Sequence, residues 1–381
     1  MNELFFSEKH YKLKNDLREF LSEKVVPIKD EIDKKREVPP WVIKEIGKRG
    51  FIGPLIPKKY NGTELGTVAH CLITEELSRV NVAISVPRTP CILMCYLVTH
   101  YGTEEQKENF LKKMATGEKI CSICVTEEEA GSNVAGIKTK AEKKGDSYLL
   151  NGSKRFITNA GVADYYFIWA ITNPNVNPRS GMSVFMVEKD THGFSTENPY
   201  GLMGIHGVQN GILNMEDVEV PKENLIGEEN KGFQSLMATF NVERITLGSE
   251  SNGISLSALE DSKKYAKSRI QFNKPISRFQ LIQIKIAEMA TKLRAARLLS
   301  YSTSKLHELG KDVTKEASMS KAFASKMAVE IASEAVQIHG GDGYTDMYSV
   351  ERYMRDAKFF QIGGGTSEIQ NLVIAREELK D

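Results

Sequence analysis

Two short stretches of the chain combine residue types that could do chemistry. The first, Thr126-Glu127-Glu128-Glu129-Ala130-Gly131-Ser132, follows an apolar run that is typical of a β-strand. It is either an acidic surface turn or a loop whose amides and hydroxyls line a polar ligand. Because three carboxylates would repel a phosphate group, the second interpretation predicts hydrogen bonds to a neutral heterocycle.

The second stretch is Cys121-x-x-Cys124, a spacing that could serve zinc binding or redox chemistry. The chain has no second pair of this kind and no two histidines at ligand spacing, so we expect reduced, buried thiols and no metal. The remaining cysteines are Cys71, Cys91 and Cys95. An odd total of 5 in a long chain without a signal sequence argues against a disulfide framework.

The composition excludes several classes of protein. The chain has 381 residues, of which 41% are hydrophobic, and this is enough for a large core and two or three domains. Lys and Arg total 51 against 50 for Asp and Glu, which indicates neither a nucleic-acid nor a membrane partner. We find no apolar run of about 18 residues that could span a bilayer. The N-terminus has no signal-peptide pattern, so a cytoplasmic location is expected by default.

The apolar spacing divides the chain into three parts and predicts an α+β, mainly α, fold. Residues 1–120 form an N-terminal helical domain, in which Thr103-Glu-Glu-Gln106 is a capping box. Residues 121–230 form a middle antiparallel β domain, whose strands are separated by turn signals such as Asn151-Gly152. Residues 231–381 contain long amphipathic segments that begin near 231, 253, 280 and 318, the number needed for a four-helix bundle.

Two long motifs carry a resemblance that extends over essentially the whole chain. CVTEEEAGSNVAGIKTKAEKKGDSYLLNGSKRFITNAG resembles the flavin-binding signature of acyl-CoA dehydrogenases, and AVQIHGGDGYTDMYSVERYMRDAKFFQIGGGTSEIQNLVIAR is similar to the second signature of that family. The resemblance implies the acyl-CoA dehydrogenase fold with FAD between the β domain and the bundle. It also implies an acyl-CoA substrate, an electron-transferring flavoprotein as partner, and a homotetramer built as a dimer of dimers.

The resemblance also assigns cofactor contacts residue by residue. Within one subunit they fall on Ile123, Val125, Thr126, Gly131, Ser132, Phe156, Ile157, Thr158, Thr366 and Glu368. Phe156 stands where many relatives have Trp, which preserves stacking on the ring but not the indole N–H. The contacts expected to reach the FAD of a neighbouring subunit are Arg269, Gln271, Phe272, Phe279, Gln280, Gln337, Gly340 and Gly341. Without the resemblance, the last group indicates only a helix turn followed by a glycine C-cap.

The catalytic base requires a separate argument. Many family members have Glu directly before the Gly-Thr of the second signature, preceded by Tyr, whereas this chain has Gly363-Gly364 there. In isovaleryl-CoA and long-chain acyl-CoA dehydrogenases the base instead precedes an Arg on an earlier helix. That position is Glu243 in ATFNVERITLG, where the other interpretation is a surface charge pair of Glu243 with Arg244.

On that assignment Glu243 removes the α-proton while a hydride leaves Cβ for flavin N5, and the backbone N–H of Gly364 binds the thioester oxygen. Further substrate contacts are expected at Ser132, Asn241, Val242, Arg244, Gly363 and Gly365. The missing Tyr and Glu side chains predict a short, branched or bulky acyl group.

Other functions remain open from the sequence. The same fold could serve an enoyl-CoA reductase or a non-oxidative acyl-CoA lyase, because flavin and base serve either direction. A non-catalytic flavin-binding homologue is the alternative of another class. Arg88 lies where the family's acyl pocket is walled, so it either binds a substrate carboxylate or is a surface arginine.

Overall fold

Helices build the N-terminal part of the chain, as the apolar spacing predicts. The computed structural model describes residues 2–380. The helices of this part are α1 (Asn2–Phe5), α2 (Glu8–Phe20), α3 (Lys29–Lys35), α4 (Pro40–Lys48), α5 (Gly66–Val80), α6 (Val82–Ser85), α7 (Arg88–Tyr101), α8 (Glu104–Gln106) and α9 (Lys112–Ala115). The predicted capping box is confirmed: the Gln106 N–H donates to Thr103 Oγ1 at 3.2 Å, and the Thr103 N–H donates to Gln106 Oε1 at 3.0 Å.

One stretch in this part, Val82–Tyr101, is long and apolar enough to cross a membrane by length and composition alone. The sequence expectation that no such run exists is therefore wrong. In the folded chain 89% of the stretch is buried inside the protein, where it forms α6 and α7 at the centre of the core. The apolar residues of these helices pack against protein on every side, which is the environment of a core helix.

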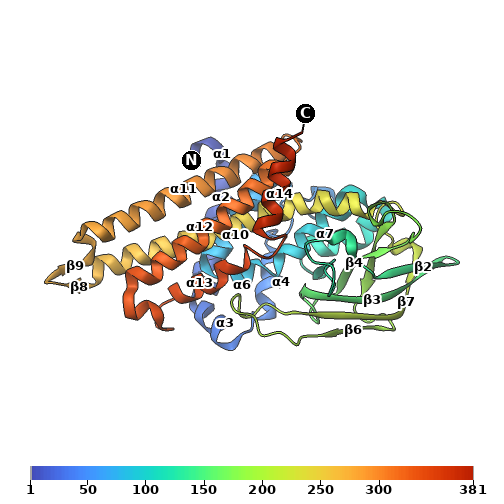
Figure 1. Ribbon diagram of the computed structural model, residues 1–381, viewed down its shortest axis with the longest axis horizontal. Coiled ribbons are helices and arrows are strands. Elements are labelled where there is room, and N and C mark those ends of the chain that lie inside the picture. The colour runs from blue at the N-terminus through green and yellow to red at the C-terminus, as the bar shows by residue number, and fades with distance from the viewer. Residues whose placement is uncertain (1, 381) are drawn as a thin grey trace.

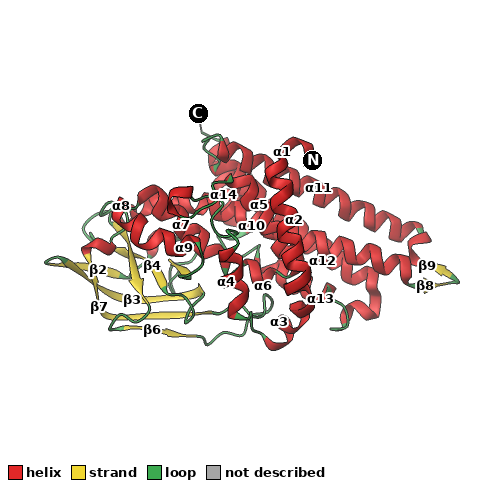
Figure 2. Ribbon diagram, turned by 180° about the vertical axis from the view of Figure 1, so that it is seen from behind, coloured by secondary structure: helices red, strands yellow, loops and turns green. Residues whose placement is uncertain are grey.

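A mixed sheet forms the middle of the chain. Its strands are β1 (Cys121–Cys124), β2 (Lys140–Lys144), β3 (Ser147–Thr158), β4 (Tyr165–Ile171), β5 (Met182–Glu188), β6 (Phe194–Glu197) and β7 (Asn210–Pro221). The order is β1-β4-β2-β3-β7-β6, with β5 paired to β4. Figure 2 shows β3, β7 and β6 of this sheet side by side. The expectation of a purely antiparallel sheet is wrong, because β1 and β4 pair in parallel and β2 and β3 lie between them in sequence.

Asn151-Gly152 is not the turn that its sequence indicates. Strand β3 continues through both residues, and its register with β7 shifts between Leu150 and Gly152. Gly152 has φ of 144°, so this dipeptide forms a β-bulge rather than a hairpin loop. The turn between β2 and β3 is made instead at Gly145, with φ of 63°.

Long helices form the C-terminal part: α10 (Gly232–Ser268), α11 (Gln280–Glu308), α12 (Thr314–His339), α13 (Val350–Phe359) and α14 (Ser367–Glu378). The two segments expected near 231 and 253 are one continuous helix, α10, which corrects the predicted helix count. Gly253 lies inside α10 because α5 packs there: a Cβ at this position would stand 2.6 Å from the Glu75 carbonyl oxygen and 2.6 Å from Ser78 Cβ. Helix α5 therefore joins α10, α11 and α12 in the packed bundle.

The sheet and the bundle lie at opposite ends of the molecule (Figure 1). Helix α10 runs between them, and the short hairpin of β8 (Ile270–Gln271) and β9 (Lys274–Pro275) projects at the end of the bundle remote from the sheet. Residues at the start of α10 can therefore face the sheet, whereas those of the hairpin cannot.

Candidate active site

The glycine run lies in the segment between α13 and α14. Gly364 and Gly365 have φ of 62° and 86°, a region that glycine adopts without strain. Lys321 Nζ donates to the Gly365 carbonyl at 2.6 Å. Gln370 Nε2 donates to the carbonyls of Gly364 at 3.1 Å and of Gly365 at 3.0 Å. Two side chains from different helices therefore fix this loop.

Glu243 faces that loop from α10. A Cβ on Gly364 would stand 3.3 Å from the carboxyl carbon of Glu243 and 3.5 Å from its Oε1. Glu243 is half-buried, and its Oε2 atom is shielded from solvent and has no hydrogen-bond partner within residues 2–380. Burial raises the pKa of Glu243 to about 7, although the positive charges of Arg244 and Lys321 act to lower it. Such a carboxyl can take up or release a proton near neutral pH.

Arg244 and Asn241 lie together beside Glu243. Arg244 Nη1 donates to Asn241 Oδ1 at 2.9 Å, and Asn241 Nδ2 donates to Thr314 Oγ1 at 3.0 Å. Both Arg244 and Glu243 are largely buried, so the surface charge pair that the sequence also allowed is wrong. Val242 is buried in the main core, which leaves only its backbone for a ligand.

A buried ion pair anchors the loop after β1. Lys154 Nζ donates to Glu127 Oε1 at 2.7 Å, to the Trp169 carbonyl at 2.7 Å and to the Val125 carbonyl at 3.1 Å. Glu127 also accepts the backbone N–H groups of Lys138 and Thr139, at 2.6 and 3.1 Å. Of the three carboxylates in this loop, Glu127 therefore points inward and holds the loop in place.

The residues around Phe156 differ in exposure. Phe156 is 52% exposed, has φ of 56°, and lies under the Arg155 guanidinium at 4.4 Å. Ile157 is buried in the core of the sheet, whereas Thr158 is half-buried and its carbonyl accepts from Ser122 Oγ at 2.6 Å. Ile123 and Thr126 are half-buried, Val125 is buried, and Gly131 and Ser132 are exposed. The exposed ring of Phe156 is thus the aromatic surface that this segment offers.

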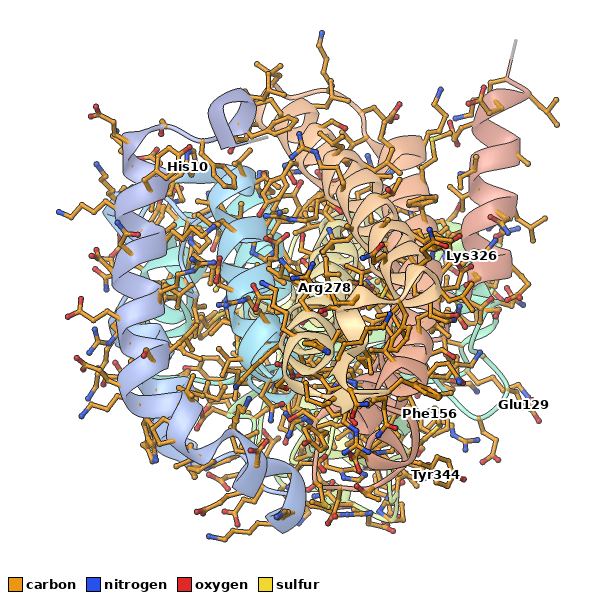
Figure 3. The ribbon with its side chains drawn as sticks, turned by 90° about the vertical axis from the view of Figure 1, so that its left-hand side faces the viewer. His10, Glu129, Phe156, Arg278, Lys326 and Tyr344 are labelled. Atoms are coloured by element: carbon orange, nitrogen blue, oxygen red, sulfur yellow. The ribbon has the colours of Figure 1, made fainter. Side chains whose placement is uncertain are left out.

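A groove of about 690 Å³ lies between α11, α12, α14 and the end of α13. Thr366 and Glu368 line it together with Lys326 and Lys358. Figure 3 shows Lys326 and Phe156 on the same side of the molecule, although they come from α12 and β3. This side therefore presents hydroxyl groups, two cations and an aromatic ring.

The remaining predicted contacts lie at the end of the bundle remote from the sheet (Figure 1), whereas Glu243 lies in the first half of α10. They are Arg269, Gln271, Phe272, Phe279 and Gln280 around the hairpin, and Gln337, Gly340 and Gly341 at the end of α12. The two groups meet each other, because Arg269 Nη1 lies 4.0 Å from Asp342 Oδ2. Phe272 is 86% exposed. This separation is what contacts to a neighbouring subunit require.

Family models match the chain along almost its full length. The N-terminal, middle and C-terminal domains of acyl-CoA dehydrogenases match residues 7–118, 122–218 and 230–379. The chain belongs to the acyl-CoA dehydrogenase family. It is 40% identical to a 3-(aryl)acrylate reductase of Clostridium sporogenes, over 99% of this chain and 100% of the relative. It is 41% identical to the caffeyl-CoA reductase-Etf complex subunit CarC of Acetobacterium woodii, over 99% and 100%.

A solved structure confirms the fold of this acyl-CoA dehydrogenase homologue. Butyryl-CoA dehydrogenase from Megasphaera elsdenii superposes with a TM-score of 0.96 at 36% identity, over 98% of this chain and 99% of that one. The chain is thus an oxidoreductase and an FAD-binding flavoprotein of this family.

The residues present fit FAD. A Cβ on Gly340 or Gly341 would meet no atom of residues 2–380 within 4 Å, so both glycines present open backbone. The Arg269 side chain is 48% exposed next to them, which suits a pyrophosphate. Elsewhere on the molecule, the Phe156 ring and the hydroxyl-lined groove suit the ring and polar parts of the cofactor.

The structure bears on two sequence expectations about the acyl pocket. A Cβ on Gly364 would stand 2.1 Å from Leu247 Cδ1, and one on Gly363 would stand 2.6 Å from the Phe359 ring. Leu247 and Phe359 therefore occupy the space that the two glycines were expected to open. Arg88 is not a surface residue, because it is fully buried and donates to the Phe51 carbonyl at 2.7 Å.

Sequence reasoning missed Lys321, Gln370 and Lys154. Each of these side chains donates a hydrogen bond to a backbone carbonyl, in two cases of a residue distant in sequence. No local motif predicts such contacts. The one available signal was a lysine within an otherwise small and apolar helix face, such as Lys321 between Ala317 and Ala324.

Proposed function

We propose that this protein interconverts an acyl-CoA thioester and its α,β-unsaturated counterpart, with Glu243 as the acid and base. The observation that supports this most is the contact of Glu243 with Gly364. This half-buried carboxyl lies against the position from which many family members present their base. Its pKa of about 7 suits proton transfer in either direction.

Each residue of the site has a proposed part in this chemistry. Bound FAD would supply the hydride acceptor, or donor, at the β carbon of the acyl group. Glu243 would move the proton at the α carbon. The N–H of Gly364 would stabilise negative charge on the thioester oxygen, and Lys321 and Gln370 would hold the loop that carries this N–H.

The names of relatives support reduction of an enoyl-CoA as the physiological direction. Two relatives that align with nearly the whole chain are a 3-(aryl)acrylate reductase and a subunit of a caffeyl-CoA reductase-Etf complex. We infer that an electron-transferring flavoprotein supplies the electrons and that the subunits form a tetramer. Dehydrogenation is the reverse of this reaction and uses the same residues.

The same names support a bulky, aryl-bearing acyl group. We expect a higher kcat/KM for 3-phenylpropenoyl-CoA than for oct-2-enoyl-CoA and, in the oxidative direction, for isovaleryl-CoA than for octanoyl-CoA. A clear preference for the straight chains in both comparisons would reject this choice of substrate without affecting the assignment of Glu243.

Anaerobic titration tests the role of Glu243. Acyl-CoA thioesters should bleach the FAD of the wild type, whereas Glu243→Gln should bind FAD and stay yellow. Glu260→Gln, the same change further along α10 at a side chain that is 41% exposed, should bleach normally. Normal bleaching of Glu243→Gln would overturn the assignment. Turnover without any flavin redox change would indicate a lyase, and no response to any thioester would indicate a non-catalytic homologue.

A further inference from the structure

A second buried carboxyl, Glu250, lies on the same helix as Glu243 and has no part in the chemistry above. It is fully buried, and its Oε1 accepts hydrogen bonds from Ser85 Oγ at 2.9 Å and Thr89 Oγ1 at 3.0 Å. Its other oxygen, Oε2, is equally buried but has no hydrogen-bond partner in the part of the chain that the structure describes. A buried carboxyl oxygen without a partner destabilises the fold, so it requires an explanation.

The neighbouring Arg88 does not supply that partner. Its Nε donates to the Phe51 carbonyl at 2.7 Å and its Nη1 to Thr74 Oγ1 at 3.0 Å. Its Nη2 lies 3.4 Å from Nδ1 of His70. All three guanidinium nitrogens are therefore directed at other groups, although the charge of Arg88 still acts on Glu250 through space.

His70 is satisfied as well. Its Nε2 lies 2.8 Å from Thr246 Oγ1, and that hydroxyl donates its own proton to the Val242 carbonyl at 2.8 Å. Thr246 must therefore accept from Nε2–H, which leaves Nδ1 of His70 as the acceptor for Arg88. In this cluster, Oε2 of Glu250 is left without a partner among the residues that the structure describes.

The position of Glu250 relates it to the acyl group. Glu243, Leu247 and Glu250 recur at the spacing that places side chains on one face of α10. Leu247 contacts the position of Gly364, so this face leads from the glycine loop toward α6 and α7. Glu250 follows Glu243 by seven residues, or about 10 Å along the helix axis. An acyl group whose α carbon meets Glu243 and which follows this face of α10 would reach Glu250.

The charges of the cluster select the kind of group that Glu250 can bind. A carboxylate on the acyl group would be repelled by both Glu243 and Glu250. A cation would be repelled by Arg88, whose charge already lies near Glu250. A neutral hydroxyl is compatible with either state of the carboxyl, because it can donate to a carboxylate and accept from a carboxylic acid.

We propose that Oε2 of Glu250 binds a hydroxyl group at the far end of the acyl chain, so that this protein selects hydroxylated thioesters. The proposal rests on the proposed function, because it uses Glu243 to locate the α carbon. That hydroxyl would lie on the order of 7–10 Å from the α carbon, a separation that a para-hydroxyphenyl ring or an extended ω-hydroxy chain can span.

The test compares matched thioesters that differ only in the hydroxyl. One pair is 3-(4-hydroxyphenyl)propenoyl-CoA and 3-phenylpropenoyl-CoA, and the other is 8-hydroxyoct-2-enoyl-CoA and oct-2-enoyl-CoA. The wild type should favour the hydroxylated member of at least one pair by roughly 10- to 100-fold in kcat/KM, because a site built to bind a hydroxyl disfavours the analogue that lacks it. The responding pair identifies the substrate as aryl or aliphatic.

In Glu250→Leu this preference should fall to nearly 1, and in Glu250→Gln it should be intermediate. Glu260→Gln on the same helix should keep the wild-type ratio. Calorimetric Kd values for the saturated thioesters give the same ratio at equilibrium, so they test Glu250 even if no thioester turns over and the proposed function fails. Equal affinity for both members of each pair, or a preference that survives in Glu250→Leu, would overturn the proposal.

Discussion

The carboxyl carbon of Glu243 lies 3.3 Å from the point at which a Cβ on Gly364 would stand. An acid from helix α10 therefore lies beside the position from which an acid on the segment before α14 would start. A side chain on Gly364 would crowd this carboxyl and would also meet Leu247 Cδ1 at 2.1 Å. The glycine at 364 is thus the structural counterpart of the glutamate at 243.

Gly364→Ala should destabilise the protein more than a glycine replacement in open space. Its φ of 62° strains any side chain, and the added methyl group also collides with Leu247. Together these effects should lower stability by roughly 2–4 kcal/mol. Gly310→Ala is the matched control, because Gly310 has φ of 69° but no described atom within 4 Å of its Cβ position. An equal fall in Tm for the two variants would contradict the prediction, because it would show that the Leu247 side chain moves away from the new methyl group without strain.

The pH dependence of the reaction should have opposite signs in its two directions. Glu243, with a pKa that burial raises to about 7, must be ionised to remove the α-proton and protonated to deliver it. Oxidation should therefore speed up as pH rises through about 7, and reduction should slow down. Single-turnover rates of oxidation and of reduction over pH 5.5–8.5 measure the two pH dependences. Glu250→Gln should keep the inflection, which excludes the other carboxyl on this helix with a pKa near 7.

Local patterns were sufficient for much of the fold. The Thr103 capping box and the apolar spacing of α5 each depend on neighbours within one or two turns, and both predicted their helices. The proposal of Glu243 as the base also came from the sequence, because Gly364 stands where many family members have the base. These features are recorded in short stretches of sequence.

Features that depend on distant packing could not be predicted in this way. Gly253 signals a helix break, but α5 approaches so closely at this point that only glycine fits, and α10 continues. Lys321 reaches a carbonyl 44 residues later in the chain. Asn151-Gly152 has the composition of a hairpin turn, yet pairing with β7 extends β3 through it as a bulge. In each case a tertiary contact outweighs the local preference.

Lys154→Met should destabilise the middle of the chain and weaken FAD binding together. The change removes one partner of a buried ion pair, leaving Glu127 uncompensated, which costs about 3–5 kcal/mol. Because Lys154 also holds the Val125 carbonyl, the loop after β1 should lose its position. Urea unfolding and the fraction of FAD retained on desalting measure the two effects.

Lys138→Met provides the control for that prediction. Lys138 pairs with Glu129, and both side chains are at least 70% exposed, so its loss should leave the stability nearly unchanged. A Lys154→Met protein that unfolds like the wild type, or that loses stability without losing FAD, would contradict the proposed anchoring of the loop.

Phe272→Ser should weaken both subunit association and cofactor retention. Phe272 is 86% exposed at the tip of the hairpin, where a monomer gains nothing from an apolar ring. If a second subunit and its FAD cover this ring, its loss should shift the assembly toward smaller species and release FAD on dilution. Leu309→Ser removes another exposed apolar side chain, at the opposite end of α11, and should do neither. Sedimentation velocity with detection at the flavin absorbance follows both properties in one experiment, and an unchanged sedimentation coefficient with full FAD content would reject an inter-subunit role for the hairpin.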